Sequence, residues 1–139
     1  MNILVTGGLG YIGSHLSLAL DKKGYKVKII DKEIENKKSL EKKILKFSSN
    51  ITIHYCNIEH FDELDNFFNH NNIDFIFHFA GLKSVPESHK FPEKYYETNV
   101  KGTEKLLNAF SKKNKNLKRF HMNENKYYVL CFCKDYFSG

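Results

Sequence analysis

The feature of the sequence that most directly indicates chemistry is a cluster of glycines near its start. Gly7, Gly8, Gly10 and Gly13 make up four of the eight glycines in the chain, and they follow a short apolar run. Glycine allows the backbone to approach a pyrophosphate, and a helix beginning there offers free N–H groups and a positive dipole end. The spacing predicts a dinucleotide-binding loop; the alternative interpretation is an ordinary tight turn.

An acidic residue stands at the position such a loop requires. Asp31 lies 18 residues beyond Gly13, at the end of the next apolar run. A carboxylate there can accept hydrogen bonds from the adenosine ribose hydroxyls and would repel a 2′-phosphate, which favours NAD over NADP. The alternative is a solvated aspartate in an unrelated loop.

Alternating strand and helix patterns surround these residues. Short β-branched and aromatic runs predict strands at residues 2–6, 26–30, 51–55, 74–79 and 117–122. Helical spacing of apolar residues predicts helices at 11–23, 36–47, 61–70 and about 92–113. This order predicts an α/β fold, a Rossmann-like doubly wound parallel sheet of about five strands and four helices.

The composition of the chain excludes or disfavours several classes of protein. A chain of 139 residues has room for one domain. Its net charge of +6 arises mostly in residues 111–139, which contain 7 of the 22 basic residues and only 2 of the 16 acidic ones. Arg119 is the only arginine, which disfavours nucleic-acid recognition. No apolar run is long enough for a membrane span. Three cysteines without metal-ligand spacing favour a reducing cytoplasm and predict no metal site.

Three motifs resemble a known family, the extended short-chain dehydrogenase/reductases. Residues 6–15 resemble the opening of these enzymes. The stretch 78–88, containing Ala80-Gly81-Leu82-Lys83 and then Val85-Pro86-Glu87-Ser88, is similar to UDP-glucose 4-epimerases. Residues 95–103 match the Tyr-Tyr…Asn-Val-x-Gly-Thr run of the same family. The resemblance covers residues 1 to about 120, roughly the first third of such an enzyme.

The resemblance implies roles for individual residues. The pyrophosphate would be held by Gly7, Gly10, Tyr11, Ile12 and Gly13, the ribose by Asp31, the adenine by Asn57 and Ile58, and the nicotinamide half by Phe79, Ala80, Gly81 and Lys83. Asn99 matches an asparagine that supports the catalytic residues. The chain departs from the family at Asn57, where aspartate is usual, and at residues 32–34, which replace an asparagine-rich segment.

The family reaction is the NAD-dependent interconversion of UDP-glucose and UDP-galactose in galactose metabolism, carried out on a UDP-hexose by enzymes that form homodimers at full length. It requires a tyrosine with a lysine four residues later and a nearby serine. No tyrosine in this chain has a lysine at that spacing, and residues 121–139 do not resemble the family.

These departures predict an NAD-binding domain at 1–120 and a divergent tail at 121–139. We expect the chain to be C-terminally truncated, cytoplasmic and inactive as an enzyme on its own. A break in the reading frame near residues 119–121 is one hypothesis for the tail, and it leaves the fifth strand as an exposed sheet edge. Two alternatives stay open: a non-catalytic NAD-binding module, or a fragment of another extended short-chain sugar-nucleotide dehydratase or epimerase. Residues 80–83 argue against the last.

Overall fold

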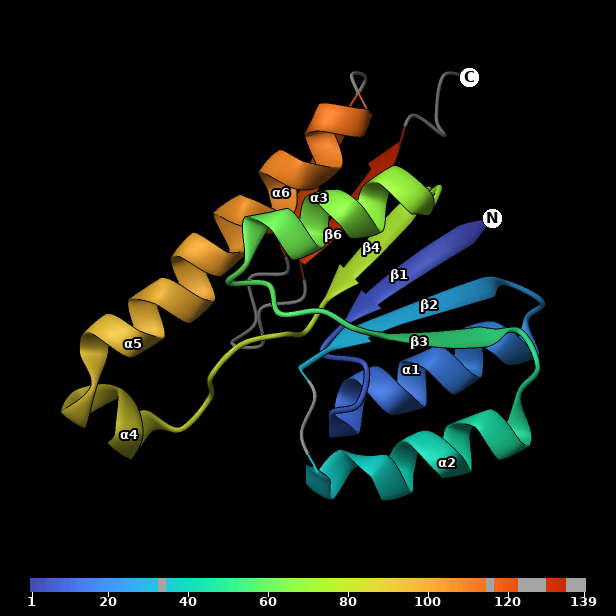
Figure 1. Cartoon of the computed structure of the whole chain (residues 1–139), viewed down its shortest axis with the longest axis horizontal. Helices are drawn as coiled ribbons and strands as arrows, with labels where there is room; N and C mark the ends of the chain where they lie inside the picture. Colours follow the sequence, from blue (N-terminus) through green and yellow to red (C-terminus); the bar gives the residue numbers. More distant parts are fainter. Residues whose placement is uncertain (33–34, 115–116, 123–129, 135–139) are drawn as a thin grey trace.

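The computed structural model describes residues 1–32, 35–114, 117–122 and 130–134, and in them strands and helices alternate (Figure 1). The strands are β1 (Asn2–Thr6), β2 (Lys26–Asp31), β3 (Ile51–Tyr55), β4 (Phe75–His78), β5 (Leu117–Met122) and β6 (Leu130–Lys134). The helices are α1 (Tyr11–Lys22), α2 (Lys38–Phe47), α3 (Phe61–His70), α4 (Val85–Lys90), α5 (Pro92–Tyr96) and α6 (Gly102–Lys113). A 3₁₀ turn, η1 (Glu35–Lys37), precedes α2, and a π-helical turn, η2 (Glu97–Lys101), precedes α6.

The strands form one sheet in the order β3-β2-β1-β4-β6-β5. The first four of these neighbours run parallel, which confirms the Rossmann-like α/β fold. Thr6 at the end of β1 stands opposite both Ile30 and His78, so β1, β2 and β4 finish at the same edge of the sheet. Ligands of parallel α/β sheets bind at this edge.

The far side of β4 differs from the expectation. β6, which the sequence patterns do not predict, lies between β4 and β5 and is antiparallel to both. The predicted strand at 117–122 forms as β5 and lies at the edge of the sheet, as expected, but its neighbour is β6 and not β4.

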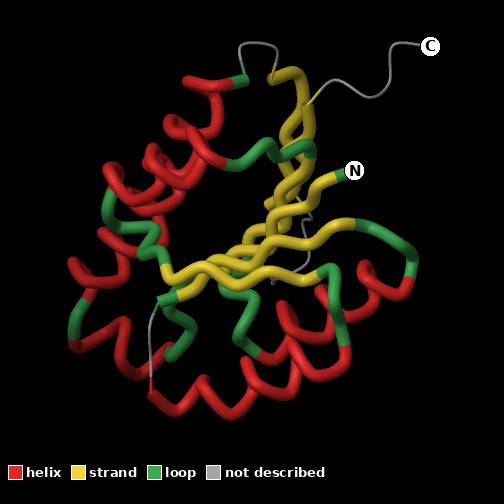
Figure 2. The backbone as a smooth tube through the Cα atoms, turned by 45° about the vertical axis from the view of Figure 1, so that its right-hand side comes forward, coloured by secondary structure: helices red, strands yellow, loops and turns green. Residues whose placement is uncertain are grey.

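Successive side chains along a strand point to opposite faces of the sheet and contribute to two hydrophobic clusters, one on each face. Figure 2 shows the sheet lying between two groups of helices. On β1, Ile3 and Val5 belong to the cluster that also contains Leu20 and Ile44 from α1 and α2, whereas Leu4 joins the other cluster. That second cluster includes these buried residues of α3 and α6: Leu64, Phe67, Phe68, Leu106, Ala109 and Phe110.

Two helices differ in detail from their sequence patterns. In α2 only Ile44 is buried, while Leu45 and Phe47 on the same apolar stripe of the sequence are 47% and 76% exposed. α2 packs beside β3, the outermost strand, and its Ile44 joins the cluster that contains Leu20 of α1. The helix predicted at 92–113 is divided by η2, and the short α4 precedes it, begun by the Ser84 hydroxyl oxygen accepting from the Glu87 N–H at 3.4 Å.

None of the helices in the described ranges combines the length and the apolar character needed to cross a bilayer.

The contrast between two phenylalanines gives a first prediction. Phe68 is 1% exposed and its ring lies 5.4 Å from that of Phe110, whereas Phe47 is 76% exposed. Phe68→Ala should lower the free energy of unfolding by about 3–5 kcal/mol through lost burial and a residual cavity. Phe47→Ala, the matched control, should change it by less than about 0.5 kcal/mol. Urea unfolding of the full chain measures both, and equal effects would contradict the described core.

Candidate cofactor-binding site

The glycine loop connects β1 to α1 with almost no free space around its backbone. Gly7 has a φ of +64° and donates its N–H to the Ile30 carbonyl at 2.9 Å. A Cβ added to Gly7 would lie 2.7 Å from the Ala80 nitrogen, and one added to Gly13 would lie 2.5 Å from the Gly7 oxygen. Both distances are shorter than real Cβ contacts, so glycine is required here by space as well as by the left-handed conformation of Gly7.

The first turn of α1 is open to an anion. Gly10 is its N-cap, no side chain caps the helix, and the first turn contains no acidic residue. The unpaired N–H groups of this turn and the positive dipole end therefore remain available to a negative ligand. Tyr11 and Ile12 at the start of the helix are 81% and 41% exposed. These features fit the pyrophosphate of a dinucleotide.

Asp31 lies beside this loop, at the end of β2, and is 7% exposed. Its Oδ2 accepts the Leu9 N–H at 3.0 Å, and its Oδ1 accepts the Lys32 N–H at 2.8 Å. Oδ1 also accepts a hydrogen bond from the Lys37 ammonium at 2.7 Å. The structure therefore brings Asp31 next to the glycine loop, where the sequence places the ribose site, and adds a lysine that sequence reasoning missed.

The end of β4 is held by a buried imidazole. His78 Nδ1 lies 2.5 Å from Thr6 Oγ1, and His78 Nε2 lies 3.0 Å from Thr103 Oγ1. Thr6 Oγ1 accepts from the N–H groups of Phe79 and Ala80, so its own proton points to Nδ1. The Thr103 hydroxyl donates to the Asn99 carbonyl at 2.6 Å, so it accepts from Nε2. These bonds require a neutral ring, and burial lowers the pKa of His78 to about 4.

The loop after β4 contains the residues predicted for the nicotinamide half. Phe79 and Ala80 are half-buried, whereas Gly81 and Lys83 are exposed. Asn99, in the π-helical turn η2, binds this loop twice: its Oδ1 accepts the Leu82 N–H at 2.7 Å, and its Nδ2 donates to the Leu82 carbonyl at 2.9 Å. The structure thus brings Asn99 together with residues 79–83.

The loop after β3 has one surface residue and one core residue. Ile58 is 3% exposed and packs against Gly102, where an added Cβ would lie 3.0 Å from its Cδ1 atom. Asn57 is half-buried: its N–H donates to Glu63 Oε2 at 2.8 Å and its Oδ1 accepts the Glu59 N–H at 3.1 Å. Asn57 therefore shapes the loop, while Ile58 anchors it to α6.

Glu59 links this loop to its two neighbours, another connection missed by sequence reasoning. Its Oε1 accepts from the Thr98 hydroxyl at 2.6 Å and from the Lys32 ammonium at 3.2 Å. The Thr98 hydrogen bond, aided by Lys32 and opposed by partial burial, lowers the pKa of the Glu59 carboxyl. Nothing in the local spacing signals this contact, because Thr98 is 39 positions from Glu59.

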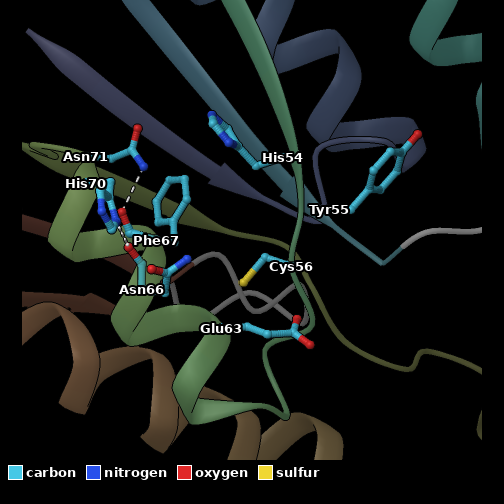
Figure 3. A pocket seen from close by; sticks show the side chains of 8 residues that line it. All are labelled: His54, Tyr55, Cys56, Glu63, Asn66, Phe67, His70 and Asn71. Carbon is cyan, nitrogen blue, oxygen red and sulfur yellow. Dashed lines mark hydrogen bonds between the residues drawn. The ribbon is translucent and has the colours of Figure 1, made fainter.

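A separate cleft of about 380 Å³ lies between β3 and α3 (Figure 3). Its lining residues are His54, Tyr55, Cys56, Glu63, Asn66, Phe67, His70 and Asn71. Burial raises the pKa of the Cys56 thiol to about 12, so it stays protonated and is a poor nucleophile. None of the residues predicted to bind a cofactor lines this cleft.

Comparison with known proteins shows the family to which the chain belongs. Residues 4–124 match the family described as GDP-mannose 4,6 dehydratase. The chain belongs to this family of sugar-nucleotide epimerases and dehydratases. It is 41% identical over 111 residues to the UDP-glucose 4-epimerase of Dictyostelium discoideum, covering 79% of this chain and 32% of that protein. It is 40% identical over 114 residues to the enzyme of Schizosaccharomyces pombe, covering 81% and 32%.

Solved epimerase structures resemble the fold. The UDP-glucose 4-epimerase of Stenotrophomonas maltophila, with bound NAD and formylated UDP-arabinopyranose, has a TM-score of 0.75 at 35% identity, covering 81% of this chain and 34% of that one. The Bifidobacterium longum enzyme, in complex with NAD⁺ and UDP, has a TM-score of 0.75 at 27% identity, covering 90% and 42%. The chain spans about a third of the length of the curated relatives it matches.

Because His78 is neutral in the folded chain, the free energy of unfolding should fall as the pH is lowered. Because its folded pKa of about 4 lies below the unfolded value of 6.5, its neutral form contributes stability above pH 6.5 that is lost as pH falls toward 4. Between pH 7.5 and 4.5 this amounts to about 2.5 kcal/mol. In urea unfolding, His78→Gln, whose amide can accept from Thr6 and donate to Thr103, should lack this loss.

Because the wild-type chain and the His78 variant carry the same carboxylates, the difference between their pH profiles isolates the imidazole. Parallel profiles would contradict the assignment. An NMR titration of the His78 ring in the wild-type chain provides a second measurement. Protonation of the ring near pH 6.5 would also contradict the assignment of a buried, neutral imidazole.

Proposed function

We propose that this chain binds NAD at the edge where β1, β2 and β4 end. The observation that carries the proposal is the crowded glycine loop beside an uncapped helix, with Asp31 at the end of the neighbouring strand. Gly7, Gly10, Tyr11, Ile12 and Gly13 would hold the pyrophosphate. Asp31 would hold the ribose and Asn57, with Ile58 behind it, the adenine. NAD bound in solved relatives supports this assignment.

The nicotinamide half would lie against residues 79–83. Phe79, Ala80 and Gly81 would form its wall, and the exposed Lys83 ammonium would reach the cofactor ribose or phosphate. Asn99 acts on this wall through its two hydrogen bonds to Leu82, as a supporting residue. When bound, NAD would supply a hydride acceptor and donor for a sugar hydroxyl carbon.

We further propose that the parent activity is UDP-glucose 4-epimerisation on a UDP-hexose. The curated relatives with this name, at 36–42% identity, support it over a dehydratase. The 139 residues contain no tyrosine with a lysine four positions later. We therefore assign residues 1–120 to NAD binding and expect them alone to lack epimerase activity; residues 121–139, which include β6, are a divergent tail in this proposal.

A glycine pair tests the cofactor site. Gly10→Ala puts a methyl group at the helix entrance, 3.1 Å from the Gly7 oxygen, and should weaken NAD binding at least about tenfold in calorimetry by holding the pyrophosphate off the backbone. Gly24→Ala is the control: its φ is +83° with open space around it, so it should cost about 1 kcal/mol of stability and leave the NAD affinity unchanged. Undetectable NAD binding by the wild-type chain would refute the proposal.

An assay of UDP-galactose conversion distinguishes an active epimerase from a module that only binds NAD. Incubating the purified chain with NAD and UDP-galactose should yield no UDP-glucose above the protein-free control, since the sequence lacks the Tyr-x-x-x-Lys pair. Measurable conversion would show that another residue of this chain supplies the base, and would overturn the assignment of residues 1–120 to binding alone.

A further inference from the structure

The loop after β4 runs into the short helix α4, and Ser84 stands at the junction of the two. As the N-cap of α4, Ser84 accepts the Glu87 N–H on its Oγ and the Ser88 N–H on its carbonyl oxygen. Its own N–H donates to a different element, because it reaches the Tyr95 hydroxyl of α5 at 3.1 Å. Figure 1 shows α4 and α5 beside each other. The Tyr95 hydroxyl therefore ties the main chain of the loop to α5.

The Tyr95 hydroxyl is itself held by Glu87. It donates to Glu87 Oε2 at 3.1 Å, while the Lys94 ammonium donates to Oε1 at 2.8 Å. The hydrogen bonds from Lys94 and Tyr95 lower the pKa of the Glu87 carboxyl, so at neutral pH this group is ionised and can only accept. The phenol proton must therefore point to Glu87, which leaves a lone pair of the phenol oxygen to accept the Ser84 N–H.

Two side chains of the segment 95–99 thus fix the loop on either side of Lys83. Tyr95 and Asn99 are four positions apart and share one face of the helical segment formed by α5 and η2. Asn99 binds the Leu82 backbone twice, and Tyr95 binds the Ser84 N–H. The Lys83 ammonium has no partner within the described residues, and its side chain is exposed. Its reach is therefore set by the two backbone neighbours that are held.

We propose that Tyr95 is a positioning residue of the cofactor site, which fixes the loop at Ser84 and thereby sets where Lys83 meets the nicotinamide half of the dinucleotide. The inference rests on the proposed NAD site and adds to it a residue that acts through Lys83. The neighbouring Tyr96 provides a contrast: it is 51% exposed, its ring lies 5.7 Å from the Lys101 ammonium, and its hydroxyl has no hydrogen-bond partner in the part of the chain that the structure describes.

Calorimetric titration of the full chain with NAD⁺ and with ADP tests this role, because ADP has the adenosine half and both phosphates but lacks the nicotinamide riboside. Tyr95→Phe should weaken NAD⁺ binding about three- to tenfold, since one hydrogen bond that holds the loop is lost, and should leave the ADP affinity unchanged. Tyr96→Phe is the matched control and should change neither affinity. Lys94→Met removes only the ion pair with Glu87 and should also change neither.

A double-mutant cycle and an exchange measurement separate this role from a general loss of structure. In a Lys83→Met background, Tyr95→Phe should no longer change the NAD⁺ affinity, because the two residues act through one contact. Amide exchange followed by NMR in the ligand-free chain should show the Ser84 N–H exchanging at least about threefold faster in Tyr95→Phe than in the wild-type chain.

Three results would overturn the inference while leaving NAD binding intact: additive effects of the two substitutions, an equal loss of ADP affinity in Tyr95→Phe, or an unchanged exchange rate at Ser84. Failure of the wild-type chain to bind either nucleotide would overturn the cofactor site, and the role of Tyr95 with it.

Discussion

The close passage of two backbone turns is the constraint on which the rest of the site depends. β1 and β4 are paired in register up to Thr6 and His78, so the turns that follow them leave the sheet side by side. At that point Gly7 has no room for a side chain, since a Cβ would lie 2.7 Å from the Ala80 nitrogen. The glycine loop, to which we assign the pyrophosphate, and the wall assigned to the nicotinamide are therefore positioned by one close contact between two backbone turns.

A network of polar side chains, buried at His78 and exposed at Asn99, holds the loops around that contact. His78 connects the end of β1 to α6 through two threonine hydroxyls, and the Asn99 carbonyl accepts from the second of these, Thr103. Asn99 then clamps Leu82 with its side chain. The bonds of His78 are shielded from water and hold the end of β4 more firmly than the exposed bonds of Asn99 hold Leu82. The same shielding keeps the imidazole neutral.

Local patterns in the sequence predicted the parts of this arrangement that depend on local physics. The glycine loop, Asp31 and the strand–helix alternation follow from residue types within a few positions of one another. The bond between Thr98 and Glu59 does not, because it forms only when two separate loops meet at the sheet edge. The ion pair of Lys37 with Asp31 lies within one connection, but it depends on how that connection folds. The π-helical turn also escapes prediction, since the apolar spacing of residues 92–113 predicts one continuous helix. β6 was missed because its residues fall where the family pattern ends.

The position of β6 shows how independent the candidate site is of the outer sheet. The hydrogen bonds that shape the loops join residues between Thr6 and Thr103, and they reach β4 only through its last residue and the two that follow. β6 pairs along β4 from Phe75 to His78 by backbone bonds, on the side away from β1. β6 pairs with β4 up to His78, whereas the contacts between the β1 turn and the loop after β4 come from Thr6, Gly7 and the residues after His78. The contacts that shape the proposed dinucleotide site thus involve no Tyr-x-x-x-Lys pair, so the shape of this region does not depend on one.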